Sequence, residues 1–259
     1  MGHYSKFLTP GSQRVFQTQE PSVDTLLSTT FVRPDGGTVV IALNLGDEPI
    51  DITIDDLESK QKSCFPKDYG YGSTVCVCNV THCDDLDPLV KTPKGVVTVF
   101  ETSKSGDRFV KTELKFGDNS GFKANKSQTI TVDKSKGVYQ KIVGFGGAFT
   151  DAAGLNIKSL PQNLQNRIIS DYFSESGIEY NLGRIPIGGS DFSTHAYSYD
   201  DNNKDDFDLL KFSLTEEDFK YKLPYLEYAL NVSLNRVQFF GSTWSPPAWL
   251  KNNSELNDG

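Results

Sequence analysis

The chain has 259 residues, 37% of them hydrophobic and 12% aromatic, so it can bury the core of one large domain or of two modest ones. Its net charge of −8 argues against nucleic acid or an anionic membrane as the main partner, because both select a basic face. The acidic balance fits either an acidic compartment or simply a solvated acidic surface. No run of 18 apolar residues predicts a transmembrane segment, and the first residues lack the apolar stretch of a signal peptide.

The first 57 residues favour β-structure. Residues 26–33 and 38–45 are rich in β-branched and apolar side chains, and the Pro-Asp-Gly-Gly sequence at 34–37 predicts a turn between them. A third run, residues 50–54, alternates apolar and polar side chains, as a half-buried strand does. The beginning of the chain is therefore predicted to form a hairpin and at least one further strand.

All the cysteines of the chain lie close together, just after a polar stretch that is predicted to be a linker (residues 58–63). They are Cys64, Cys76, Cys78 and Cys83. A zinc site is one interpretation, but the Cys-x-Cys spacing without a companion C-x-x-C pair fits it poorly. Two disulfides in a secretory protein are the favoured interpretation, because glycosylation sequons occur as well. The sequons begin at Asn79, Asn125, Asn231 and Asn252.

From about residue 141 the pattern changes to alternating strands and helices. Residues 141–147 predict a strand that ends in glycines, and residues 159–174 predict a helix. The apolar stripe of this helix is predicted from a spacing of four: Leu164, Ile168 and Tyr172. A second strand is predicted over residues 180–187, again followed by glycines.

A second helix is predicted to begin at Ser213, with Glu216 completing a capping box and Pro224 as a kink or break. Its apolar face is predicted to carry Phe219, Leu223, Leu226 and Leu230. A third strand follows at residues 236–241. Strands alternating with helices in this way are typical of a parallel α/β sheet, in which functional side chains collect just past the carboxyl ends of the strands.

The glycine-rich segment after the first of these strands, residues 144–151, is not a nucleotide-binding loop. Its spacing is not G-x-G-x-x-G, no lysine follows, and Phe149 stands where the third glycine would be. The segment is interpreted as a tight turn from strand to helix. No cofactor and no metal ion are expected from any motif in the chain.

The other two strand ends carry more unusual residues. Asp191 and Phe192 follow the second strand, where the carboxylate could bind sugar hydroxyls or could simply cap a turn. Arg184 lies inside the same apolar strand, and a buried guanidinium needs a carboxylate partner, so its role is either to orient a catalytic group or structural. Trp244 and Trp249 follow the third strand; each is a candidate sugar platform or a core residue.

Taken together, residues 64–259 resemble the N-terminal part of the lysosomal glucosylceramidases (acid β-glucosidases) of glycoside hydrolase family 30. The resemblance is carried by CFPKDYGYGSTVCVCNVTHCD, QKIVGFGGAFTDAAGLNI, DYFSESGIEYNLGRIPIGGSDFS, DDFDLLKFSLTEEDFKYKLPYL and STWSPPAWLK. Residues 1–57 resemble the C-terminal β-sandwich of the same family, through GHYSKFLTPGSQRV and VRPDGGTVVIALN. The chain thus carries family segments in swapped order, as at a junction of two tandem copies.

The resemblance implies a fold with α/β and all-β parts, namely an incomplete (β/α)8 TIM barrel of three strands with a β-sandwich domain. The implied domains are a sandwich segment at 1–57, the linker at 58–63, a disulfide-bearing β region at 64–140 and a truncated barrel at 141–259. We also expect that the two sandwich segments could form one permuted sandwich.

The resemblance also implies particular residue roles. It implies disulfides Cys64–Cys76 and Cys78–Cys83, with glycans on Asn79 and Asn125. It implies glucose contacts from Asp191 and Trp244, with Phe192 nearby and Arg184 in support.

In the family, a retaining mechanism at acidic pH uses one glutamate as acid/base and another as nucleophile. The resemblance implies that both lie beyond Gly259, since no N-E-P segment occurs, so this chain alone is expected to be inactive. The implied substrate is glucosylceramide or a related β-glucoside, with an activator protein that presents the lipid as a further partner. The implied location is lysosomal or secreted. The alternatives are a non-catalytic sugar- or lipid-binding protein and a β-sandwich interaction module.

Overall fold

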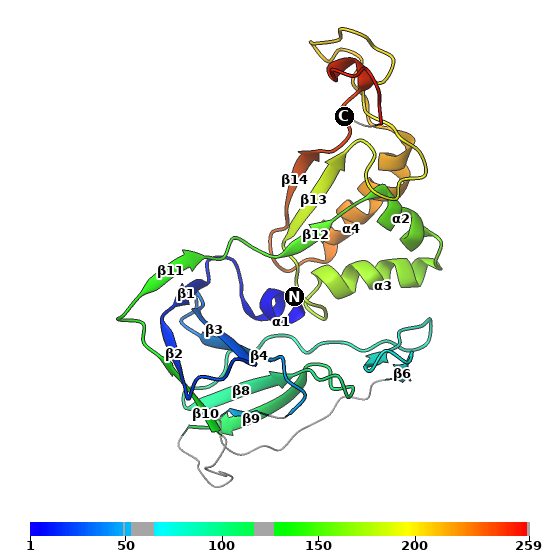
Figure 1. Ribbon diagram of the computed structural model, residues 1–259. Helices are drawn as coiled ribbons and strands as arrows, with labels where there is room; N and C mark the ends of the chain where they lie inside the picture. Colours follow the sequence, from blue (N-terminus) through cyan, green and yellow to red (C-terminus); the bar gives the residue numbers. More distant parts are fainter. Residues whose placement is uncertain (49, 53–64, 117–126, 258–259) are drawn as a thin grey trace. The chain divides into compact units, whose positions relative to one another are not determined.

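The computed structural model describes residues 1–48, 50–52, 65–116 and 127–257 of the chain (Figure 1). The described chain divides into two compact units, Met1–Gly144 and Phe145–Gly259, which we call unit 1 and unit 2. The regular elements of unit 1 are almost all strands, whereas unit 2 alternates strands and helices. The predicted linker at 58–63 lies outside the described residues, and the boundary between the units falls four residues after the predicted start of the barrel.

Unit 1 contains one short helix and eleven strands among the described residues. They are α1 (Gly2–Phe7), β1 (Gln13–Val15), β2 (Gln17–Glu20), β3 (Leu26–Val32), β4 (Thr38–Asn44), β5 (Asp51–Ile52), β6 (Pro66–Asp68), β7 (Thr74–Cys76), β8 (Val96–Glu101), β9 (Val110–Lys115), β10 (Ser127–Val132) and β11 (Val138–Lys141). Sheet order is β11-β1-β3-β4 in the largest sheet and β2-β10-β5 in the next, with β6-β7 and β8-β9 as separate pairs.

The hairpin predicted near the start of the chain is confirmed. Strands β3 and β4 run antiparallel in unbroken register from Leu26↔Asn44 to Val32↔Thr38. The turn closes through two backbone hydrogen bonds: the Arg33 N–H donates to the Gly37 carbonyl oxygen (2.8 Å), and the Gly36 N–H donates to the Arg33 carbonyl oxygen (2.9 Å). Of the third predicted strand, Asp51–Ile52 form β5, and residues 53 and 54 lie outside the described residues.

Strands from the two halves of unit 1 pair with each other. β1 lies between β3 and β11, and β10 lies between β2 and β5. The pairing of β10 with β2 is antiparallel over four residues, from Thr129↔Glu20 to Val132↔Gln17. Segments that resemble opposite ends of one family domain are therefore hydrogen-bonded in shared sheets.

Unit 2 contains three parallel strands in the order β12-β13-β14. Its elements are β12 (Gly146–Ala148), α2 (Asp151–Lys158), α3 (Gln162–Phe173), β13 (Leu182–Ile187), the π-helix η1 (Asp218–Lys222), α4 (Leu223–Val232), β14 (Gln238–Thr243) and the 3-10 helix η2 (Ala248–Leu250). Figure 1 shows α2, α3 and α4 on one side of this sheet. The three predicted strands are present, although β12 is only half as long as expected because Lys141 belongs to β11 of unit 1.

The core of unit 2 lies between the sheet and these helices. Its buried members are Phe149, Ile169, Phe173, Tyr225, Leu226, Ala229 and Val237. The predicted stripe on α3 is wrong by one position, because Ile169 and Phe173 are buried while Tyr172 is exposed. The predicted face of the second helix is confirmed only at Leu226, which is buried in the core, whereas Phe219, Leu223 and Leu230 are exposed.

The second helix departs from the prediction because it opens with a π-helix. In η1 each turn takes in an extra residue, which rotates the residues before Leu223 away from the face that a regular α-helix would give them. The capping box is also displaced by two residues from Ser213 and Glu216. Thr215 and Asp218 form it instead: an Asp218 carboxylate oxygen accepts hydrogen bonds from the Thr215 backbone N–H and hydroxyl, both at 3.0 Å.

The glycine-rich segment forms the tight turn that was predicted. A Cβ on Gly146 would lie 1.8 Å from the carbonyl oxygen of Leu182, so only glycine allows β12 to approach β13 this closely. Thr150 then caps α2, with its side chain accepting a hydrogen bond from the Ala153 N–H at 3.0 Å. Helix α2 itself was not predicted.

Candidate functional site

A pocket of about 340 Å³ opens at the carboxyl end of the three-stranded sheet. Its lining residues come from the start of α2, from β13 and the turn after it, and from the residue after β14. They are Thr150, Ala152, Ala153, Asn156, Arg184, Ser190, Asp191, Phe192 and Trp244. Four of the five side chains singled out from the sequence at these strand ends line this one pocket: Asp191, Phe192, Trp244 and Arg184.

The turn after β13 presents Asp191 and Phe192 to the pocket. Gly188 begins it with φ +83°, a conformation that glycine adopts without strain. Phe192 has φ +67°, which is unusual for a bulky residue, and its side chain is 93% exposed. An exposed aromatic ring held in this conformation at the mouth of a pocket is available for contact with a ligand.

The side chains of Arg184 and Trp244, which both line the pocket, pack against each other. The guanidinium carbon of Arg184 lies 4.5 Å from the centre of a Trp244 ring, within cation–π range. The structure shows no ion pair between Arg184 and any described carboxylate, and its Nε has no hydrogen-bond partner among the described residues. The carboxylate expected beside Arg184 is therefore not found in the described part of the chain, and the indole ring is its observed partner.

Trp249 does not line the pocket. Its indole N–H donates to the carbonyl oxygen of Asp200 at 2.9 Å, and its ring meets Phe207 edge-on with centroids 5.3 Å apart. Of the two tryptophans considered as sugar platforms, only Trp244 lies in the pocket wall.

Asp151 supports the pocket from beneath and was missed from the sequence. It is the first residue of α2 and is 4% exposed, and its carboxylate accepts a hydrogen bond from the Ser193 hydroxyl at 2.8 Å. The same Ser193 oxygen accepts from the Ser190 N–H at 2.9 Å. Asp151 therefore ties the turn that carries Asp191 to the start of α2. The sequence does contain one sign of this role: Asp151 follows Thr150 directly after a strand, and such Thr-Asp pairs often begin helices.

A buried ion pair lies behind the same turn. Lys222 and Asp218, 1% and 2% exposed, are 3.1 Å apart between Nζ and Oδ1. Tyr199 donates its hydroxyl hydrogen to Asp218 and accepts one from Lys222 at 3.1 Å. Burial, followed by the hydrogen bond to Asp218, raises the pKa of the Tyr199 phenol well above its usual range. The phenol therefore stays neutral and remains a hydrogen-bond donor at physiological pH.

The neighbouring Tyr197 is held neutral in the same way. Burial raises the pKa of its phenol well above the usual range, and the nearby carboxylate of Asp151 adds to the effect. Lys222 Nζ lies 5.5 Å from the centre of each of the two tyrosine rings. Behind the pocket, the Lys222–Asp218 ion pair is thus accompanied by two neutral phenols, those of Tyr197 and Tyr199.

The pocket can bind a neutral polar molecule that has an apolar face. Asp191 is the one carboxylate among its lining residues, and Trp244 and Phe192 supply aromatic surface. Sugars have this combination of hydroxyls and C–H faces, and aromatic rings present a flat apolar surface to them. Retaining cleavage of a glycosidic bond needs two carboxyl groups about 5–5.5 Å apart, a pair that the lining residues do not supply.

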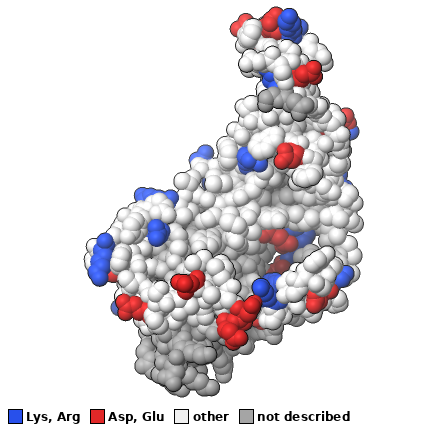
Figure 2. All heavy atoms as spheres, in the orientation of Figure 1, with Lys and Arg blue, Asp and Glu red and all other residues white. Residues whose placement is uncertain are grey.

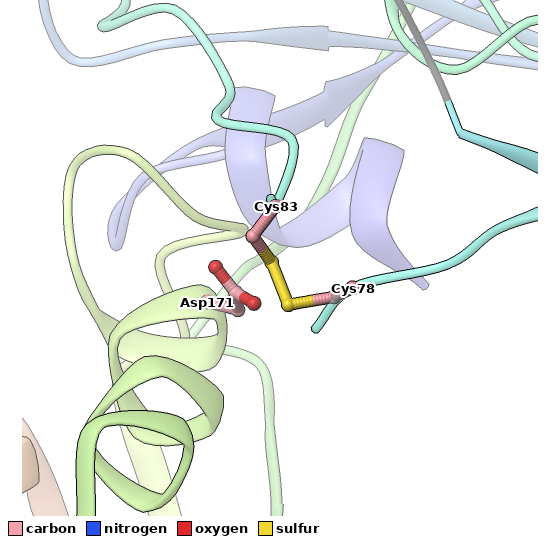
Figure 3. Close-up of side chains that lie close together, drawn as sticks. All are labelled: Cys78, Cys83 and Asp171. Carbon is pink, nitrogen blue, oxygen red and sulfur yellow. A yellow bond between two sulfur atoms is a disulfide. The ribbon is translucent and has the colours of Figure 1, made fainter. Parts of the chain in front are cut away.

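The cysteine cluster of unit 1 contains a disulfide. Cys78 and Cys83 are bonded, as predicted (Figure 3). Cys76 is also disulfide-bonded, whereas its expected partner Cys64 lies outside the described residues. No free cysteine occurs among the described residues.

The sequon at Asn79 lies on the surface inside the short Cys78–Cys83 loop. Asn79 is exposed, and its side-chain oxygen accepts hydrogen bonds from the Thr81 N–H and hydroxyl, both at 2.9 Å, and from the His82 N–H at 3.0 Å. The second expected glycan position, Asn125, lies outside the described residues.

The described residues form only short helices and carry charges of both signs. Among the described residues, the helices are all too short or too polar to span a membrane. On the face shown in Figure 2, Lys and Arg side chains are interspersed with Asp and Glu among uncharged residues.

Comparison with known proteins agrees with this architecture. The sequence model of the glycosyl hydrolase family 30 TIM-barrel domain matches residues 142–259, and that of the family's beta sandwich domain matches residues 11–68. A putative glucosylceramidase 3 of Caenorhabditis elegans is 42% identical over 198 residues, covering 76% of this chain and 38% of the relative. The lysosomal acid glucosylceramidase of Mus musculus is 41% identical over 194 residues, covering 75% and 37%.

A more distant relative is an endo-1,6-beta-D-glucanase, BGN16.3, of Trichoderma harzianum. It is 36% identical over 139 residues, covering 49% of this chain and 28% of the relative. The chain thus spans less than two fifths of the length of each of these relatives.

The two family-model matches place the chain in the class of glycoside hydrolases, and the three parallel strands with their covering helices are consistent with part of a TIM barrel. The chain belongs to glycosyl hydrolase family 30. The resemblance noted in the sequence and the predicted fold class, a partial TIM barrel with a β-sandwich domain, are both confirmed.

Proposed function

We propose that the pocket of unit 2 binds the glucose unit of a β-glucoside, and that the chain is part of a glucosylceramidase-type retaining glycosidase. The observation that carries the proposal is the convergence of Asp191 and Trp244, which follow two different strands, on one pocket. In this proposal Asp191 accepts hydrogen bonds from sugar hydroxyls, and Trp244 packs against the C–H face of the ring. Phe192 covers the opening of the pocket, and Arg184 holds the indole of Trp244 in place.

The substrate named by two of the relatives supports glucosylceramide as the full substrate. Both are glucosylceramidases and match about three quarters of this chain. The pocket volume of about 340 Å³ accommodates a single sugar ring rather than a sugar with its lipid. We therefore propose that the ceramide portion, and any activator protein that presents it, contacts other surfaces of the enzyme. Equal affinity of the chain for methyl glucoside and for glucosylceramide in bicelles would agree with this, whereas much tighter binding of the lipid would contradict it.

We propose that this chain alone does not hydrolyse the glucosidic bond. A retaining glycosidase forms and then breaks a glucosyl-enzyme with two carboxyl groups, and Asp191 is the single carboxylate among the lining residues. Incubation with 4-methylumbelliferyl β-D-glucopyranoside at pH 5 tests this directly. Release of the fluorophore above the rate of a heat-denatured sample would contradict the proposal.

Binding of methyl β-D-glucopyranoside to the full chain tests the sugar pocket. We expect binding that is detected by saturation-transfer NMR and weakened at least tenfold by Trp244→Ala and by Asp191→Asn, because each change removes one side of the sugar contact. Trp249→Phe is the matched control, since that indole lies outside the pocket. Methyl β-D-galactopyranoside, with an axial 4-hydroxyl, should bind more weakly than the glucoside.

The outcomes separate the candidate functions. Glucoside binding without turnover would also fit a non-catalytic sugar- or lipid-binding protein, and turnover by a longer chain that carries both carboxylates would decide for the glycosidase. If the wild-type chain did not bind the glucoside, the proposed sugar-binding function of the pocket would be contradicted. A partner-binding activity unaffected by Trp244→Ala would then favour a β-sandwich interaction module.

We propose a lysosomal or secreted location for the protein. The Cys78–Cys83 disulfide and the exposed sequon at Asn79 support passage through an oxidising secretory compartment, and one relative is named lysosomal. We expect the protein from eukaryotic secretory cells to carry a glycan on Asn79. Intact-mass analysis should show its loss in Asn79→Gln and in Thr81→Ala, whereas Thr81→Ser should retain it. An unglycosylated Asn79 in such cells would contradict the proposed location.

A further inference from the structure

Lys222 is a buried cation whose hydrogen bonds and ion pair go to residues outside the pocket lining. Its side chain is 1% exposed, at the last position of η1, and it pairs with Asp218 at 3.1 Å. A methionine has a side chain of similar length and would occupy the same space without the cost of burying a charge. The presence of an ammonium group here therefore indicates that its hydrogen bonds have a specific task.

Two of those hydrogen bonds reach the main chain where β13 ends. Lys222 Nζ donates to the carbonyl oxygen of Pro186 at 3.2 Å and to that of Gly188 at 3.3 Å. Pro186 is the second-last residue of β13, and Gly188 is the left-handed residue that starts the turn. One ammonium group thus fixes the backbone on both sides of Ile187. Because hydrogen bonds to a charged donor are about twice as strong as neutral ones, this point of the turn is held firmly.

The next two residues of the turn are fixed in succession. Gly189 donates its N–H to the carbonyl oxygen of Tyr197 at 2.9 Å and accepts the Ser245 hydroxyl at 2.7 Å. Ser190 donates its N–H to Ser193. Asp191 and Phe192 follow directly. Each residue from Gly188 to Ser190 is therefore held by at least one hydrogen bond, so a shift at Gly188 is passed along the main chain to Asp191.

We propose that Lys222 is a positioning residue for ligand binding: through the carbonyls of Pro186 and Gly188 it sets the place of Asp191 and Phe192 in the pocket. This rests on the proposed sugar-binding function of that pocket. Without the ammonium group, the two carbonyl oxygens lose a charged donor and the turn shifts to find other partners. A displacement of about 1 Å at Asp191 is enough to break its hydrogen bonds with a ligand.

The test compares glucoside binding by folded variants of the full chain. Lys222→Met removes the charge at nearly constant volume, and Lys222→Arg keeps the charge but replaces the compact ammonium with a planar group of different reach. Both are expected to weaken binding of methyl β-D-glucopyranoside by at least tenfold, measured at 10 °C where tryptophan fluorescence shows the chain folded. Ser245→Ala removes one later contact of the turn, leaves the ion pair intact and is expected to weaken binding about threefold to tenfold.

A core variant separates positioning from general loss of stability. Phe173→Leu destabilises unit 2 from within its core, and Phe173 is not among the residues that line the pocket. It should leave the dissociation constant for the glucoside unchanged. In ¹⁵N-labelled protein, the amide signals of Asp191 and Phe192 should move in the Lys222 variants and stay in place in Phe173→Leu.

Glucoside binding by the wild-type chain decides which of the two proposals a negative result contradicts. Suppose that the wild-type chain binds the glucoside and that Asp191→Asn weakens this binding. If the folded Lys222 variants then bind the glucoside as tightly as wild type, the positioning role of Lys222 is overturned and the proposed function stands. If Lys222→Met does not fold, the affinity and the amide signals of Lys222→Arg decide in the same way. If the wild-type chain does not bind the glucoside, both proposals fail.

Discussion

Replacing Gly154 with alanine is expected to lower the free energy of unfolding of unit 2 by about 3 kcal/mol, the upper end of the usual range for overpacking. A Cβ on this residue of α2 would lie 1.8 Å from the carbonyl oxygen of Tyr221. Tyr221 lies in η1 between Asp218 and Lys222, whose buried contacts hold that turn in place. Neither backbone can move away without breaking the packing of α2 on η1.

Urea unfolding followed by tryptophan fluorescence measures this effect in unit 2 alone, because Trp244 and Trp249 are the only tryptophans of the chain. The matched control is Gly147→Ala, where the nearest atom to an added Cβ is 3.9 Å away and the change should be nearly neutral. Equal stability of the Gly154→Ala and Gly147→Ala variants would show that α2 does not pack on η1 as described.

Replacing Asp218 with asparagine is expected to lower the free energy of unfolding by about 3–5 kcal/mol, because it leaves the charge of Lys222 buried without its counter-ion. Asparagine keeps nearly the same shape, so the loss measures the charge rather than the packing. The double variant Asp218→Asn, Lys222→Met should recover a large part of that stability, because it removes the unpaired cation as well.

The control for the Asp218 variant is another charge removal in the same stretch of chain. Glu216 is 66% exposed in its side chain and pairs with Lys220 one helical turn on. Glu216→Gln should change the free energy of unfolding by no more than about 0.5 kcal/mol, since exposed ion pairs are screened by water. A loss at Asp218 as small as that at Glu216 would mean that the Lys222 site is open to solvent.

The parts of the fold that follow from local chemistry could be predicted from the sequence. The hairpin at 26–45 was predictable because its turn sequence selects the conformation that the chain adopts, and the three parallel strands were predictable because glycines end two of them. Helix α2 was missed because its sequence, DAAGLNIK, contains a glycine, which lowers helix propensity; the tight contact with Tyr221 requires that glycine. The π-helix η1 has no local signature, so the helical period placed Phe219 on the wrong face.

In the candidate site, too, some residues could be predicted from the sequence and others could not. Asp191, Phe192, Arg184 and Trp244 could be found because they are unusual residues in or directly after strands, and parallel strands bring such positions together. Asp151 and Lys222 could not be found in this way, because their partners are a serine 42 residues away and two backbone carbonyls more than 30 residues away. A lysine in a charged stretch of sequence normally indicates a solvated surface, and only the folded structure shows it buried.

The three-stranded sheet of unit 2 has a consequence for how the protein responds to heat. Among the described strands, β12 and β14 each pair with β13 alone, and β14 carries the exposed ring of Phe240. The unpaired backbone groups of such edge strands can hydrogen-bond to strands of other molecules. Chains that unfold partly on heating would therefore aggregate before they refold. Thermal denaturation would then be irreversible and governed by the rate of opening, and the apparent melting temperature would rise with the scan rate and fall with the protein concentration.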